Sequence, residues 1–232
     1  MNAFSMEGYK TLLSGFVSAG YDFRFFDGTY DTSGVVFLRH DVDFHIPCAV
    51  QIAALERNMG IRSTFFFLIN SELYNLLEAE NLRQAKQIAD MGHMVCFHVD
   101  ETALHTLDNQ DARACFQKQA AAFTAMLPFA ERHVISRHRP DLSKAADWIP
   151  DGVLDVYSAP FFKDIEYASD SRGRWAYGHP TGREAFRQKN SFQLLTHPVW
   201  WVRNEENSRD KLNSVLMERQ EAGRRYINGY DL

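Results

Sequence analysis

Short apolar runs alternate with longer amphipathic segments along this chain. Runs such as 35–38 are typical of buried strands, whereas segment 47–59 has apolar residues at helical spacing. Because strands alternate with helices, we expect parallel strands joined by helical crossovers, and six or seven of them would close into a distorted (β/α) barrel. The predicted strands are 35–38, 64–69, 93–98, 132–137, 154–162, 165–168 and 192–196, and the predicted helices are 47–59, 72–91, 110–126 and 208–226.

Composition points to one ordinary globular domain. Of the 232 residues, 45% are hydrophobic and 24% are charged, which is near the globular average. The chain has no internal repeat, low-complexity tract or linker, so we expect residues 1–232 to form a single α/β domain. Its net charge is −5. An acidic chain without a basic stripe is a poor candidate for nucleic-acid binding.

Cysteine usage and the first residues indicate the compartment. Cys48, Cys96 and Cys115 are too few and too scattered for a disulfide framework, and an odd count fits reduced thiols. The chain does not begin with a basic leader and an apolar run, and no stretch approaches the roughly 18 apolar residues of a membrane span. We therefore expect a cytoplasmic protein that does not span a membrane.

Polar side chains follow several of the predicted strands. Asp41 and Asp43 come after the run 35–38, and His98, His138 and His197 each end a later strand. Taken singly, the carboxylates could cap the next helix and each histidine could be a core residue. In a parallel barrel, however, the C-terminal ends of all strands share the face that carries the active site. One Asp and two His suit a divalent metal, and a further Asp and His suit a general base and acid. This set predicts metal-assisted hydrolysis.

Five short motifs occur in a fixed order between residues 33 and 202. They are LRHDVD at 38–43, STFF at 63–66, GHMVCFH at 92–98, YASDSRGRW at 167–175 and LLTHP at 194–198. In this order the chain resembles the polysaccharide deacetylases, the NodB-homology domains of carbohydrate esterase family 4. The resemblance is greatest to the deacetylases encoded in O-antigen biosynthesis clusters. It implies a NodB-like barrel and removal of an N-acetyl group from a sugar in lipopolysaccharide biosynthesis.

The resemblance also assigns roles to single residues. Asp41 matches the family's catalytic base and His197 its general acid. The family's metal-binding Asp follows the base directly, where this chain has Val42, and a subgroup shifts that ligand to the position of Asp43. His98 matches a metal-binding histidine, and His93 matches a histidine with a structural role.

The third metal ligand departs from the family pattern. The family has a second His four residues after the first, where this chain has Thr102. Candidates for the missing ligand are His138, His105 and Glu101. On one helix, His98 and His105 would lie about 10.5 Å apart along the axis, too far for one metal. His138 comes from its own strand end and is favoured, with His105 as the alternative.

Substrate contacts are expected from basic and aromatic residues. In the family an Arg contacts the catalytic base, and Arg137 or Arg139 would supply it here. Asp170 and Trp175 would line the pocket, and Trp200 and Trp201 could stack on the sugar's apolar face. The candidate substrate-binding residues are Arg137, Arg139, Asp170, Trp175, Trp200 and Trp201.

The expected substrate is an N-acetylated sugar linked to a nucleotide or a lipid, and the expected cofactor is Zn²⁺, with Co²⁺ or Ni²⁺ as alternatives. One rival is a hydrolase of a non-sugar amide, such as a ureido compound. Arg172 and Arg174, together with Arg137 and Arg139, could suit a carboxylate or phosphate on such a substrate. A second rival is a carbohydrate-binding pseudoenzyme without metal, which Thr102 motivates.

Overall fold

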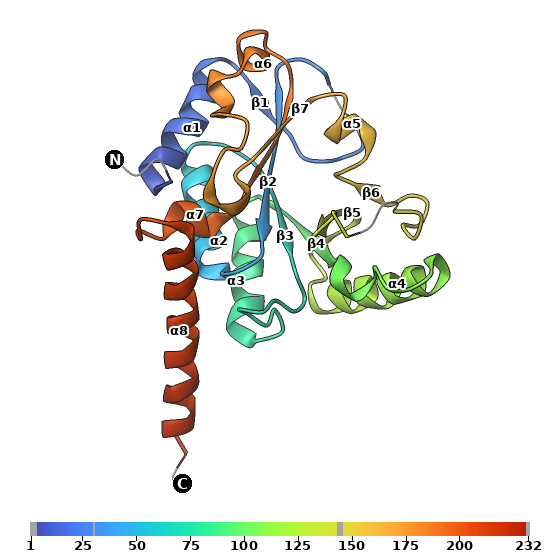
Figure 1. The fold of residues 1–232 in the computed structure, drawn as a ribbon, viewed down its shortest axis with the longest axis vertical. Helices are drawn as coiled ribbons and strands as arrows, with labels where there is room; N and C mark the ends of the chain where they lie inside the picture. Colours follow the sequence, from blue (N-terminus) through green and yellow to red (C-terminus); the bar gives the residue numbers. More distant parts are fainter. Residues whose placement is uncertain (1–3, 30, 143–145, 231–232) are drawn as a thin grey trace.

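A curled sheet of parallel strands forms the centre of the molecule (Figure 1). The structure is a computed structural model that describes residues 4–29, 31–142 and 146–230. Within these residues the sheet has eight strands in the order β6-β5-β4-β3-β2-β8-β7, with β1 paired to β2 off this path. The strands are β1 (Asp22–Phe23), β2 (Val35–Val42), β3 (Thr64–Phe67), β4 (Met94–Asp100), β5 (Glu131–His138), β6 (Leu154–Asp155), β7 (Glu166–Ser169) and β8 (Phe192–Thr196). Every pairing is parallel, which confirms the predicted strand direction.

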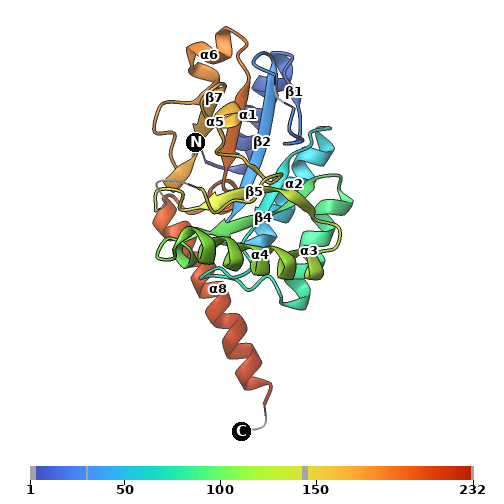
Figure 2. The ribbon, with the colours of Figure 1, turned by 90° about the vertical axis from the view of Figure 1, so that its right-hand side faces the viewer.

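Helices cover the outside of the curled sheet. Figure 1 shows α1, α2 and α7 beside β2, while α4 lies at the far end next to β4 and β5. In Figures 1 and 2, α8 extends away from the rest of the molecule. The helices are α1 (Met6–Ser18), α2 (Ile46–Asn58), α3 (Ala79–Asp90), α4 (Asn109–Met126), α5 (Ala159–Phe162), α6 (Glu184–Arg187), α7 (Pro198–Val202) and α8 (Ser208–Asn228), with short 3₁₀ turns at η1 (Glu101–Ala103), η2 (Ser171–Gly173) and η3 (Pro180–Gly182).

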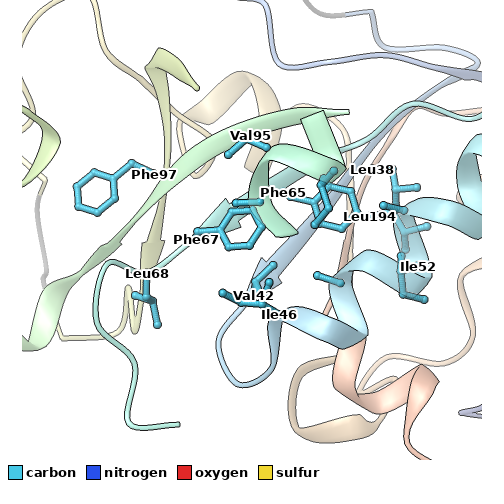
Figure 3. Packing of buried hydrophobic residues seen from close by; sticks show 14 of the residues in the cluster. Leu38, Val42, Ile46, Ile52, Phe65, Phe67, Leu68, Val95, Phe97 and Leu194 are labelled. Atoms are coloured by element: carbon cyan, nitrogen blue, oxygen red, sulfur yellow. The ribbon is translucent and has the colours of Figure 1, made fainter. Parts of the chain in front are cut away.

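β2 is buried along its whole length and has two different faces. Val36 and Leu38 belong to the larger apolar cluster beneath the helices, part of which Figure 3 shows. Val35 and Phe37 belong to a smaller cluster inside the curl. Because successive side chains of a strand alternate, Arg39 and Asp41 continue the inner face, and His40 and Val42 continue the outer face. We keep the terms inner and outer face below.

The segment after β3 differs from the prediction. A helix was expected over 72–91, but α3 begins only at Ala79. Tyr74 prevents an earlier start, because its hydroxyl donates to Val42 O at 2.6 Å and accepts from Leu68 N at 3.0 Å. Ser71 Oγ donates to Asp43 O at 2.6 Å. The loop therefore fastens the backbone at the end of β2, where two candidate site residues lie.

The predicted strand 154–162 is also different. It divides into the short strand β6 and the short helix α5, whose first turn contains Pro160. Proline has no N–H for a sheet ladder, so the strand cannot continue through it. The side chain of Gln193 donates to Val156 O at 2.9 Å and so bonds the backbone that follows β6.

The structure bears on two further expectations, which concern the cysteines and membrane-spanning helices. Cys48, Cys96 and Cys115 are free thiols. None of the helices in the described ranges combines the length and the apolar character that crossing a bilayer requires.

Candidate active site

The predicted polar residues meet at the C-terminal edge of the sheet. Asp41 lies near the end of β2 and Asp43 just beyond it, His98 lies in β4, His138 ends β5, and His197 follows β8. These strands are neighbours in the sheet, with β3 between β2 and β4. Residues far apart in sequence are therefore brought to one edge, as parallel strand order requires.

Asp43, His98 and His138 form a candidate metal centre. One potential ligand atom from each lies within 4.8 Å of the other two. Asp43 Oδ1 lies 3.2 Å from His98 Nε2 and 3.5 Å from His138 Nδ1. The structure thus brings together the three residues favoured as ligands from the sequence.

The chemistry of this donor set fits a divalent cation. Asp43 Oδ1 is buried and has no hydrogen-bond partner among the residues that the structure describes. His98 Nδ1 lies 3.0 Å from Ser136 O, and because a carbonyl can only accept, Nδ1 must carry the proton. This tautomer turns the lone pair of Nε2 towards Asp43, as is usual for a metal-binding histidine. The carboxylate oxygen of Asp43 has no hydrogen-bond donor, and the lone pair of His98 faces it, so both atoms are placed to bind the same cation.

The ionisation of Asp43 supports the same conclusion. Burial alone would raise its pKa, but the contact with His138 and the charge of His197 hold the pKa well below its ordinary value. The contact with Asp43 also outweighs burial at His138 and raises the pKa of that ring. Asp43 is therefore a carboxylate at neutral pH, which is the form that binds cations.

Asp41 lies on the inner face beside this centre. Its side chain is 3% exposed, and Oδ2 accepts from Ser136 Oγ at 3.3 Å. Arg39 Nη2 approaches the same oxygen at 3.5 Å. Arg39 itself is held by Ser136 at 2.8 Å and by Tyr157 at 2.7 Å. The other oxygen, Oδ1, is buried and has no hydrogen-bond partner among the described residues.

The expectation that Arg137 or Arg139 contacts the base is wrong, because Arg39 makes this contact. Arg137 instead pairs with Glu101 at 2.8 Å and with Asp155 at 2.9 Å. Ser136 occupies the inner face of β5, so the next residue points to the opposite face. Arg39 was not among the predicted residues, although an Arg two residues before Asp41 in a buried strand must share its face.

Two other candidates lie away from the centre. His105 is exposed, and its Nδ1 lies 3.1 Å from Thr102 O. It does not belong to the group of ligand atoms described above. Arg139 is exposed and lies 3.9 Å from Asp141. Glu101, the remaining candidate ligand, forms the ion pair with Arg137 described above.

His197 and Asp170 form a buried pair on the other side of the centre. His197 Nδ1 lies 2.6 Å from Asp170 Oδ1, and the backbone N–H of His197 also donates to this carboxylate. His197 Nε2 then lies 3.6 Å from Asp43 Oδ2. Burial lowers the pKa of His197, but Asp170 outweighs it and raises the pKa to about 9. The imidazole therefore carries a proton at neutral pH.

Asp170 and Trp201, which were predicted to bind substrate, are both buried. Asp170 is 0% exposed and Trp201 is 1% exposed. Trp201 Nε1 donates to Asp170 Oδ2 at 2.7 Å, so both residues orient His197 from behind. Trp175 packs against Phe4 and Trp201, with ring centroids 6.1 Å apart in each case.

Trp200 is the predicted tryptophan that lines a cavity next to the site. This cavity of about 350 Å³ is also lined by Asp43, Phe44 and His197. Its volume lies within the range of small-molecule sites, about 300–1,000 Å³. A substrate bound there would contact both the candidate metal centre and the histidine.

Comparisons with known proteins place the fold. No family model matches the sequence, and no curated protein matches it at a significant level. The structure of the chitin deacetylase from the fungal pathogen Colletotrichum lindemuthianum matches 81% of this chain and 83% of its own, with 21% sequence identity and a TM-score of 0.50. The chain has the NodB-like fold. At this identity, the likeness shows the fold alone.

Other similar structures have lower scores. A peptidoglycan N-acetylglucosamine deacetylase matches 92% of each chain at 18% identity, with a TM-score of 0.47. A CE4 family pseudoenzyme from Bacillus anthracis matches 81% of this chain and 61% of its own at 17% identity, with a TM-score of 0.44.

Proposed function

We propose that this protein is a metal-dependent deacetylase that hydrolyses the N-acetyl group of a sugar. One observation carries the proposal: the group Asp43, His98 and His138 lies between a base candidate, Asp41, and an acid candidate, His197. Amide hydrolysis needs an activated water, a polarised carbonyl and a proton for the leaving amine.

Each residue has a distinct part in this reaction. Asp43, His98 and His138 would hold the cation, which we propose to be Zn²⁺, with Co²⁺ or Ni²⁺ as alternatives. When bound, a divalent cation supplies a Lewis acid that lowers the pKa of water and polarises a carbonyl oxygen. Asp41 accepts the proton of the attacking water at Oδ1, while Arg39 and Ser136 hold Oδ2. His197, oriented by Asp170, donates a proton from Nε2 to the leaving nitrogen.

The finer proposal concerns the substrate. We infer an N-acetylated sugar linked to a nucleotide or a lipid, deacetylated in the cytoplasm during synthesis of a surface polysaccharide such as O-antigen. The motif order between residues 33 and 202 supports this inference. The cavity beside Trp200 offers room for a single sugar unit with a substituent.

Metal content and activity test the proposal together. Purified wild type is compared with Asp43→Ala, His98→Ala, His138→Ala and the control His105→Ala by inductively coupled plasma mass spectrometry. Free amine released from N-acetylated sugars is measured on the same samples. We expect about one metal per chain in wild type and in the control, and loss of metal and activity in the three ligand variants.

Two results would count against the proposal. Full metal retention in His138→Ala would remove it from the ligand set. Absence of metal in wild type, even with excess Zn²⁺, would favour a carbohydrate-binding protein over a hydrolase.

A further inference from the structure

Two arginines line the cavity that contains His197. Arg172 comes from the turn η2 after β7, and Arg209 comes from the first turn of α8. Both are exposed. Asp43 also lines this cavity, and it belongs to the candidate metal centre. The cavity is therefore lined by two exposed cationic groups in addition to Asp43 and His197.

Neither arginine has an ion-pair partner among the described residues. Several other arginines are paired, among them Arg137 with Glu101, Arg183 with Glu166, and Arg203 with Glu218. Unpaired cations gathered at one concave surface produce a positive local potential that attracts anions. The charges of Arg172 and Arg209 are therefore available to an anion that enters this cavity.

The backbone around Arg172 is held in an unusual conformation. Its φ is 61°, in the left-handed region that residues other than glycine seldom adopt. Ser208 Oγ donates to Arg172 O at 3.0 Å and fastens this turn to the start of α8. At Gly173, with φ 68°, an added Cβ would lie 2.1 Å from Ser208 Oγ. The contact with Ser208 holds the turn that contains Arg172 next to the start of α8, where Arg209 lies. A left-handed backbone conformation at a residue other than glycine often accompanies a binding role.

We propose that Arg172 and Arg209 bind a phosphate group on the substrate, which makes the substrate a phosphate-bearing N-acetylated sugar. This inference rests on the proposed function. A guanidinium offers a planar fork of donors that matches phosphate oxygens, and two forks suit a doubly charged group. Trp200 and Phe44 supply an apolar wall for the sugar ring.

Binding of inorganic phosphate tests the arginines without any turnover. Metal-loaded full-length wild type is compared with Arg172→Ala/Arg209→Ala by titration calorimetry. Arg224→Ala is the matched control, because Arg224 is exposed on α8 but does not line the cavity. Each guanidinium would donate charge-assisted hydrogen bonds to the phosphate, so we expect at least tenfold weaker binding in the double variant only. Equal affinity in the double variant would overturn the proposal, because phosphate held by the metal alone would bind equally in both.

Activity then identifies the substrate class. The values of kcat/KM are compared for methyl N-acetylglucosaminide, for N-acetylmuramic acid, which carries a carboxylate, and for N-acetylglucosamine linked by a diphosphate to uridine or to farnesol. We expect at least a tenfold preference for the two diphosphates, lost in the double variant and kept in Arg224→Ala. The better diphosphate names the nucleotide or lipid source.

The two proposals can fail separately. Deacetylation without a diphosphate preference, or with a carboxylate preference, would overturn the phosphate site and leave the deacetylase. Phosphate binding that depends on the arginines, without deacetylation of any sugar, would retain the anion site and refute the deacetylase.

Discussion

The two faces of β2 carry two buried polar clusters that differ in one respect. The inner cluster consists of Arg39, Asp41, Ser136 and Tyr157, and the outer cluster consists of Tyr9, His40, Glu56, Ser63 and His93. In the outer cluster, both oxygens of Glu56 accept hydrogen bonds, one from Tyr9 and the other from Ser63 at 2.5 Å. In the inner cluster, Oδ1 of Asp41 has no hydrogen-bond partner among the described residues.

The two carboxylates differ in what they can contribute: Glu56 to the stability of the fold, and Asp41 to the proposed reaction. A buried carboxylate whose oxygens are both occupied holds the helix layer to the sheet and has no capacity left for a reaction. A buried carboxylate with an unoccupied oxygen is costly to the fold, since a polar group without a partner loses its hydration. Adjacent residues of one strand, His40 and Asp41, therefore belong to regions with different purposes.

The largest effect is expected from Asp41→Asn, which removes the proton acceptor of the inner cluster but keeps its shape. General bases contribute about 10²–10⁴-fold, so kcat should fall by this amount. Initial rates of amine release measure the loss. Circular dichroism and metal content should match wild type, since Asp41 is not in the ligand group. Activity near the wild-type level would show that Asp41 is not the base.

Glu56→Ala should have the largest effect on stability. The change leaves the hydroxyls of Tyr9 and Ser63 and the ring of His40 without their common partner. Hydrogen bonds to a charged group contribute about 1.5–3 kcal/mol each, so losing those of Tyr9 and Ser63 should lower the free energy of unfolding measured in urea by about 3 kcal/mol or more. The control is Glu80→Ala, which removes an exposed ion pair with Arg83 and should cost far less. Equal losses would contradict the structural role of the outer cluster.

A matched pair of smaller changes sharpens the comparison. Tyr9→Phe and Tyr157→Phe each delete one hydroxyl that bonds a charged partner, Glu56 or Arg39. Such bonds contribute about 1.5–3 kcal/mol. Tyr9→Phe should lower the free energy of unfolding and leave kcat unchanged. Tyr157→Phe should lower kcat, because Arg39 would lose the hydrogen bond that positions it beside Asp41. The same pattern in both variants would argue against separate roles.

The smallest effect concerns acid sensitivity of the outer cluster. Burial raises the pKa of Glu56, but His40, His93 and Ser63 outweigh it and lower the pKa below its ordinary value of 4.5. Burial lowers the pKa of His93 below its ordinary value of 6.5. Both groups bind protons less readily in the folded state than in the unfolded chain, so acid favours unfolding.

The pH dependence then follows in two steps. The stability associated with His93 is complete above pH 6.5 and falls as the pH drops below that value, and the part associated with Glu56 falls below pH 4.5. Urea unfolding between pH 8 and pH 4 measures both. Glu56→Gln should have a shallower loss below pH 4.5 than wild type. An identical slope there would exclude Glu56 as a source of acid sensitivity.

The parallel strands and the strand-end residues could be predicted because they depend on local pattern. Apolar runs mark the strands, and parallel order then brings Asp43, His98 and His138 to one edge. Contacts made by side chains across the sheet could not be predicted in this way. The position of Arg39 depends on Ser136 and Tyr157, and the turn at Tyr74 depends on the distant carbonyl of Val42. The alternation of β2 places Arg39 on the same face as Asp41 but does not identify these partners, and the segment around Tyr74 gives no sign of its contact.

The loop that fastens the end of β2 has a consequence for metal exchange. Ser71 and Tyr74 bond the backbone at Asp43 and Val42, and Ser136 bonds the ring of His98. These contacts involve no cation, so little conformational entropy is lost when one binds. Small zinc domains, by contrast, fold only with their metal. We therefore expect the fold to remain intact after a chelator removes the metal. Different divalent ions should then bind one after another at the same preformed site.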